Sequence, residues 1–178
     1  MKKKMFIIIS ILLIVTTISF TISFLIKKSS VNNEFVLGKV SSEIIETFDK
    51  DNNIKSNVFV KNTGNVSTYI RVALTFSWVD SDGNILFEEP NLGTDYIIDM
   101  SNSSSWIYGN DGFYYYILPV DAGGNTDNLI DMCKPITLYH DKNFVLDITA
   151  QSIQANPVSA VIESWNVNVI NNRIVFNG

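Results

Sequence analysis

Hydrophobic and polar residues alternate along several stretches of this chain, as they do in strands that bury one face. The longest example runs from Ile70 to Trp78, where almost every second residue is large and apolar. Successive side chains of a strand point to opposite faces of a sheet, so this alternation predicts a strand with one buried face. Residues 144–148 alternate in the same way. We expect both sets to form one continuous core face, made of Ile70, Val72, Leu74, Phe76, Trp78, Phe144, Leu146 and Ile148.

Further short stretches fit strands and are separated by turn residues. The predicted strands cover 34–48, 54–62, 85–89, 106–108, 113–120, 143–155, 165–170 and 173–176. Residues 127–133 fit either one helical turn or an edge strand, and Pro157–Trp165 fits a short helix that starts with a proline. The alternation changes phase at Ile153, which suggests a bulge or a strand end. This organisation predicts an all-β fold, an antiparallel jelly-roll-like β-sandwich with one short helix.

Two glycines lie in predicted turns between strands. Gly64 stands in "NTGN" and Gly83 in "DSDGN", and both are expected to meet a backbone requirement, because glycine reaches positive φ without a steric penalty. "DSDGN" also resembles a calcium loop through Asp80 and Asp82. An EF-hand loop needs its glycine at the sixth position, whereas Gly83 stands fourth, so a hairpin turn is the favoured interpretation.

The first 28 residues carry the pattern of an export signal. Three lysines precede an uncharged run of 22 residues, Met5–Ile26, and two more lysines follow it. About 20 apolar residues suffice to cross a bilayer, so a cleaved signal peptide and a retained N-terminal transmembrane helix both stay open. The leading lysines favour an N-terminus inside the membrane and the rest of the chain outside. The expected parts are therefore residues 1–28, a signal peptide or membrane anchor, and residues 29–178, an exported β-sandwich domain.

The exported part is strongly acidic. Five of the 13 basic residues precede residue 29, which leaves eight basic against 18 acidic residues and a net charge near −10. Such a charge disfavours nucleic acid and anionic lipid as partners, so contact with a membrane is expected only through residues 5–26, if they are not cleaved. Cys133 is the only cysteine, so the chain forms no internal disulfide.

Few residues offer catalytic or metal-binding chemistry. His140 is the only histidine, no H-E-x-x-H or G-x-S-x-G motif is present, and "LYHDKN" is typical of a surface turn. Cys133 is expected to be a small buried apolar residue. The sequence therefore predicts no catalytic, cofactor-binding or metal-binding residues and no enzyme activity. The "FYYY" stretch of residues 113–116 fits either stacking on a sugar or a neighbouring subunit, or a half-buried strand.

Several blocks together resemble a known family. They are "FVLGKV", "VKNTGNVSTYIRVAL" followed by "DSDGN", "WIYGNDGFYYYILPV", "NLID" and "DITAQSIQANPVSAVIESWNV", in this order between residues 35 and 167. This order and spacing resemble the BsaA-type, SipW-dependent biofilm matrix proteins of Gram-positive bacteria, relatives of TasA and camelysin. The resemblance implies a jelly-roll-like β-sandwich, export through a dedicated signal peptidase, and assembly into extracellular fibres of a biofilm matrix.

The expected function is therefore structural, with the chain secreted to the extracellular matrix or the cell surface. Its expected partners are further copies of itself or related matrix proteins, besides the signal peptidase during export. A cell-surface module that binds a glycan or a protein stays open as the alternative. Fibres of sandwich domains can form when one subunit lends a strand to the next, and residues 29–40 are best placed to be lent. The predicted assembly residues are Phe35, Val36, Leu37, Val40, Tyr114 and Tyr116.

Overall fold

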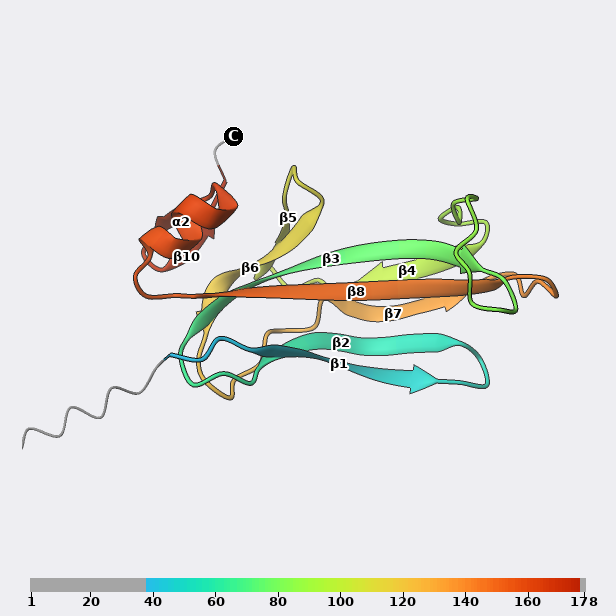
Figure 1. Ribbon diagram of the computed structural model, residues 1–178, viewed down its shortest axis with the longest axis horizontal. Helices are drawn as coiled ribbons and strands as arrows, with labels where there is room; N and C mark the ends of the chain where they lie inside the picture. The colour runs from blue at the N-terminus through green and yellow to red at the C-terminus, as the bar shows by residue number, and fades with distance from the viewer. Residues whose placement is uncertain (1–37, 177–178) are drawn as a thin grey trace, which may run out of the picture. The chain divides into compact units, whose positions relative to one another are not determined.

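The computed structural model describes residues 38–176, which form two four-stranded antiparallel sheets, a two-stranded hairpin and one short helix (Figure 1). The first sheet has the order β1-β2-β7-β4, and the second has the order β5-β6-β3-β8. The strands are β1 Ser42–Asp49, β2 Ile54–Asn62, β3 Thr68–Val79, β4 Tyr96–Met100, β5 Trp106–Tyr108, β6 Phe113–Val120, β7 Ile130–Pro135, β8 Asn143–Gln154, β9 Asn168–Ile170 and β10 Arg173–Val175. Helix α2 spans Ser159–Trp165.

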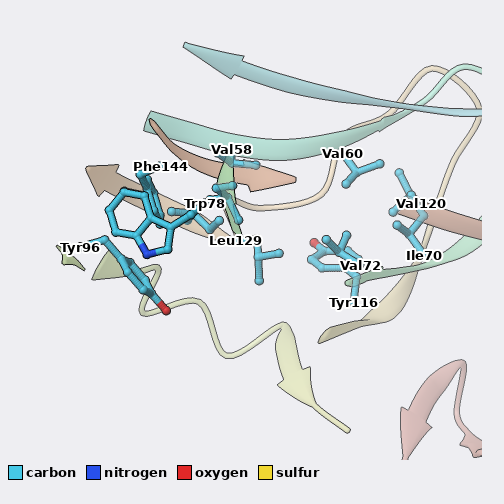
Figure 2. Close-up of a cluster of buried hydrophobic side chains, with 13 residues drawn as sticks. Val58, Val60, Ile70, Val72, Trp78, Tyr96, Tyr116, Val120, Leu129 and Phe144 are labelled. Atoms are coloured by element: carbon cyan, nitrogen blue, oxygen red, sulfur yellow. The ribbon is translucent and has the colours of Figure 1, made fainter. Parts of the chain in front are cut away.

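The two sheets pack face to face around the main core, which confirms the predicted β-sandwich. The inner face of the second sheet carries the predicted apolar sets of β3 and β8, and β2, β4 and β7 supply the opposite side. Figure 2 shows Trp78, Tyr96 and Phe144 gathered at one end of this core. The rings of Tyr96 and Phe144 are stacked with their centres 4.8 Å apart, and Trp78 meets Phe144 edge-on at 6.0 Å. Core and sheets are thus built by the alternation that the sequence displays.

The strand order is jelly-roll-like because strands distant in sequence lie side by side. β7 lies between β2 and β4, and β3 lies between β6 and β8. β1 pairs with its neighbour in sequence, β2, and not with β8. β8 is therefore at the end of its sheet, although it is 12 residues long.

A second, smaller core covers the outer face of the second sheet at one end. There α2 and the β9–β10 hairpin pack on Tyr69, Tyr115 and Ile117. Ile153 belongs to this second core, whereas Leu146 faces the first. The register of β8 against β3 runs without a shift from Asn143 to Gln154, so there is no bulge at Ile153, and the strand ends at the next residue, Gln154. The hydrophobic alternation changes phase because one face of β8 is buried in the main core near Leu146, and the opposite face is buried in the second core near Ile153.

The structure also corrects three local predictions. The first described strand begins at Ser42, and residues 38–41 precede it without strand pairing. Residues 130–135 form neither a helical turn nor an edge strand but β7, which is paired on both sides. In the predicted strand 85–89, only Ile85 makes a single bridge, to Val79. Turn residues mark where strands can end, but strand order and strand length depend on pairing with distant strands, which turn residues do not reveal.

Gly64 and Gly83 are required for different reasons. Gly83 has a φ of 85° in the turn after β3, as predicted. Gly64 does not have a positive φ, so that part of the prediction is wrong. Instead, a Cβ at Gly64 would lie 2.2 Å from the carbonyl oxygen of Lys39, because the segment before β1 runs against this turn. The backbone N–H of Asn65 donates to that same oxygen at 3.0 Å.

Candidate assembly surface

The long free edge of β8 is the most prominent interaction surface of the described domain. Within residues 38–176, β8 pairs with β3 alone, so its other edge presents unpaired backbone groups. Figure 1 shows β3 on one side of β8 and the strands of the other sheet, β7, β2 and β1, on the other side. Asp147 is the only charged residue of β8, and the strand contains no proline. These are the properties of an edge that accepts a further strand.

Two hydrogen bonds show which residues of β8 direct their backbone N–H and C=O groups toward the free edge. The N–H of Ala155, just after the strand, donates to Ser67 on the β3 side at 2.8 Å. On the other side, the Asn53 side-chain amide donates to the carbonyl of Phe144 at 3.4 Å. The N–H and C=O of one residue point the same way and alternate along a strand, so even-numbered residues direct these groups to the free edge. They are Phe144, Leu146, Ile148, Ala150, Ser152 and Gln154.

The other three edges of the two four-stranded sheets are less suited to strand addition. β4 has five residues and β5 has three, so each offers few backbone groups. β1 is longer but carries Glu43, Glu46 and Asp49, and its pairing with β2 is irregular between Ile45 and Thr47. Acidic side chains, bulges and short strands are the usual means by which sheet edges avoid further pairing. β8 is 12 residues long, pairs with β3 without a bulge and carries a single acidic residue, Asp147.

A groove runs beside this edge, between β8 and the β1–β2 pair. One cavity of about 240 Å³ is lined by Ile44 of β1 together with Leu146 and Ile148 of β8. A second cavity of about 160 Å³ adjoins it and is lined by Phe48, Phe144 and Cys133 among others. The even residues of β8 thus place apolar side chains against the interior while their backbone groups face the groove. An incoming strand would bury apolar side chains and form hydrogen bonds at the same time.

The charged residues that line the groove are Lys55, Glu46 and Asp147. Lys55 of β2 lies on its wall and forms an ion pair with Glu46, with Nζ 2.7 Å from Oε1. The Cys133 thiol is 2% exposed, and its burial raises its pKa to about 11, against a smaller opposite effect of Lys55. Cys133 is thus the small buried apolar residue that the sequence predicts, and it is a neutral thiol at physiological pH.

The predicted assembly residues fall in different environments. Phe35, Val36 and Leu37 lie outside the described residues. Val40 is 37% exposed and precedes β1. Its neighbours are tied to the turn at residues 63–65, because the carbonyls of Lys39 and Ser41 accept hydrogen bonds from that turn. The end of the segment proposed for lending is therefore held by its own domain.

The tyrosines of "FYYY" lie in β6, which is a strand paired on both sides. Tyr116 is 7% exposed in the main core, with its ring centre 5.1 Å from that of Trp106. Tyr114 packs against the same core and against Tyr108 of β5 at 4.7 Å. Both tyrosines thus lie in a half-buried strand, and β3 separates this strand from β8.

The residues that the sequence raised for catalysis or calcium binding, His140, Asp80 and Asp82, lie in connections between strands. His140 is exposed in a bend between β7 and β8, as expected. Asp80 accepts hydrogen bonds from the N–H groups of Asp82 and Asn84, at 2.9 and 2.8 Å, and these bonds fix the turn. Hydrogen bonds from Asn84 hold the pKa of the Asp80 carboxyl below its ordinary value. Among residues 38–176, no group of three or more His, Cys, Asp or Glu side chains is arranged to hold a metal ion.

No family model, curated protein or solved structure matches this chain. In the described part of the chain, no helix is long and apolar enough to cross a membrane, and the predicted run Met5–Ile26 lies outside that part. Sequence patterns did not identify the β8 edge, because the alternation of an edge strand equals that of an inner strand. A single charged residue, Asp147, and the absence of proline were the only sequence signals, and the strand order gives them meaning.

Proposed function

We propose that this chain is an extracellular structural protein whose copies join by strand addition into fibres of a bacterial biofilm matrix. The observation that carries the proposal is the long free edge of β8 beside a groove whose lining combines apolar residues (Ile44, Leu146, Ile148) with charged ones (Glu46, Lys55, Asp147). The acidic charge of the exported part and the family resemblance of the sequence support the same function. The partner is a second copy of the chain or a related matrix protein.

The occupant that we propose for the groove is residues 29–37 of a second copy. Nine residues in extended form reach about 30 Å, enough to run along most of the 12 residues of β8. Phe35 and Leu37 would fall on one side at strand spacing and complete the apolar floor of the groove. Residues 38–41 stay with their own domain through the contacts at Gly64 and Asn65, so they form the joint between subunits.

Cleavage after the apolar run would act as the trigger for assembly. While Met5–Ile26 anchors the chain, residues 29–37 are tethered to the membrane and cannot reach a neighbour freely. Once the signal is removed, the same residues form a free N-terminal end. Export and polymerisation are thereby coupled, and fibres form outside the cell.

Ala150→Pro tests the acceptor edge. The N–H of Ala150 points to the free edge, so proline removes a donor for the added strand without removing a bond to β3. We expect the exported chain to stay folded and to lose fibres in electron microscopy and large species in sedimentation. Ala150→Ser keeps the N–H and is the matched control, with fibres expected at the unmodified yield.

Deletion of Ser29–Leu37 tests the donor. A folded monomer that no longer polymerises is the expected result, and polymerisation is expected to return when a synthetic peptide of residues 29–37 is fused back to the N-terminus. Fibres of unchanged length and yield in both the deletion and the proline variant would refute strand addition at β8.

A further inference from the structure

A polar and aromatic pocket lies away from the β8 edge, on the outer face of the second sheet. Its volume is about 540 Å³, within the range of roughly 300–1,000 Å³ that is usual for small-molecule sites. The turn between β5 and β6 forms one wall, and the segment from the end of α2 into β9 forms another. Its lining includes Tyr115, Trp165 and Phe176, with Tyr115 edge-on to the other two rings at centre distances of 5.7 and 5.0 Å.

Arg71 of β3 is the central charged residue of this pocket. Its guanidinium carbon lies 4.0 Å from the centre of the Phe113 ring and 4.9 Å from that of Trp165. Nε and Nη2 donate to the Gln151 side-chain oxygen at 2.9 and 2.8 Å, and Nη1 donates to Asp111 at 3.2 Å. The hydroxyl of Tyr115 accepts from Nη1 at 2.8 Å and donates to Asp111 at 2.7 Å. The site is rigidly built before any ligand enters.

These contacts decide the charge of a suitable ligand. The aromatic rings are already occupied by the Arg71 cation, so a second cation would meet a like charge in the same place. An anion would have to compete with Asp111 for Arg71, within a domain that carries a net charge near −10. Arg71 and Asp111 cancel each other, and the other residues that line the pocket carry no charge. A neutral ligand therefore fits best.

The remaining wall provides hydrogen-bonding groups without internal partners. The side chains of Asn110, Ser164 and Asn166 make no hydrogen bonds within the described residues, and neither does the indole N–H of Trp165. Asparagine amides offer donors and acceptors, a serine hydroxyl offers both, and the indole offers a donor. Aromatic carbon next to such groups suits a molecule with apolar C–H faces and many hydroxyls.

We infer that this pocket binds a neutral saccharide unit, so that the domain contacts a matrix or cell-wall glycan as well as other protein subunits. Phe176, which is partly exposed, supplies the aromatic surface, and Asn110, Ser164 and Asn166 bond the hydroxyls. The inference does not depend on strand addition, because the pocket lies on the outer face of the sheet and the groove at its β8 edge lies between the sheets. A bound glycan and an added strand could be held at once.

Binding of defined saccharides to the full chain tests this inference. The chain is purified in a detergent that lacks a sugar head group, and isothermal titration is carried out with maltohexaose, cellohexaose, hexa-N-acetylchitohexaose and the anionic oligogalacturonate. We expect at least one neutral hexamer to bind with 1:1 stoichiometry, and Asn110→Ala and Trp165→Phe each to weaken it about ten-fold, as for one lost hydrogen bond. Asn102→Ala, an exposed asparagine outside the pocket, is the matched control and should bind as the unmodified chain does.

Three results would overturn the inference. They are the absence of binding by all neutral hexamers at millimolar concentration, tighter binding of oligogalacturonate than of any neutral hexamer, and unchanged affinity in both pocket variants. Asn110 lies in an exposed turn, so its variant remains informative if Trp165→Phe impairs folding. Polymerisation is measured on the same samples. Loss of saccharide binding with normal fibres separates this site from the proposed assembly.

Discussion

At the scale of single residues, neighbouring positions of β3 differ sharply in what their side chains contribute. Leu74 packs against the main core, and Thr75 is exposed on the outer face of the second sheet. Leu74→Ala should lower the free energy of unfolding by about 2–3 kcal/mol, since it removes apolar contacts and leaves a cavity. Thr75→Ala should change it by less than about 0.5 kcal/mol. Urea denaturation of both variants measures this, and equal shifts of the midpoint would show that the facing of β3 is misassigned.

Residues also show where sequence reasoning succeeds and where it stops. The facing of Ile70, Val72 and Trp78 follows from period-two alternation, which is local and independent of the partner strands. Gly64 is different, because its role comes from the close approach of Lys39, 25 positions earlier in the chain. No local pattern contains that contact. The Arg71 pocket was missed for the same reason, since β3, β6, β8 and α2 bring its residues together only in the folded domain.

At the scale of elements, two connections are joined at one end of the sandwich. The loop before β4 holds Asp95, which is 6% exposed, and the connection from β7 to β8 holds Tyr139 and Lys142. The Tyr139 hydroxyl donates to Asp95 at 3.1 Å, and Lys142 forms an ion pair with Glu88 at 2.7 Å. Lys142 also lies 4.5 Å from the centre of the Trp78 ring. These contacts close the end of the core where the aromatic side chains gather.

The carboxyl of Asp95 should make this end sensitive to acid. The N–H of Asn91 donates to it at 2.8 Å, and this bond, with the Tyr139 and Asn91 side chains, holds the Asp95 pKa below its ordinary value. A depressed folded-state pKa adds stability above the unfolded pKa of about 4, and this stability is lost as the pH falls through the folded value. We expect the fall in the urea midpoint between pH 7 and pH 2 to be smaller in Asp95→Asn than in the unmodified chain.

Asp99→Asn, an exposed carboxylate of β4, serves as the control for that comparison. It removes one exposed carboxylate and leaves the hydrogen bonds of Asp95 in place. If Asp95→Asn and the unmodified chain lost equal stability between pH 7 and pH 2, the hydrogen bonds of Asp95 would not be the source of acid sensitivity.

Element types were largely predictable, and element neighbours were not. Alternation and turn residues identify β2, β6 and α2 closely. The segment of β7 is short and has no clear alternation, so only its pairing with β2 and β4 makes it a strand. Equally, one edge of β8 is free because β1 pairs with β2 and not with β8. Strand order is a property of long-range contacts, and a single sequence contains no direct record of them.

At the scale of the whole domain, the two proposed interactions use different faces. Strand addition uses the groove between the two sheets at the edge of β8, and saccharide binding uses the outer face under α2 and the β9–β10 hairpin. A structural matrix protein needs contacts of both kinds if its fibres are to be held within a glycan matrix. Separate faces allow both contacts without competition between them.

Cys133 gives a direct probe of whether a strand enters the groove in the assembled state. The thiol is 2% exposed and lines the cavity of about 160 Å³ at the groove, so a small reagent reaches it only by that route or by local opening. With its pKa raised to about 11 by burial, roughly one thiol in a thousand is ionised at pH 8, and alkylation by N-ethylmaleimide should quicken about ten-fold per pH unit up to pH 10.

Strand addition would close this route, so the polymer should react at least about ten-fold more slowly than the monomer at the same pH, as followed by mass spectrometry. Ala150→Pro provides the matched control, because it should keep the monomer rate at concentrations where the unmodified chain polymerises. A urea-unfolded sample gives the rate of a fully accessible thiol. If polymer and monomer were alkylated at one rate, the added strand would not lie in this groove, and subunits would have to join through another surface.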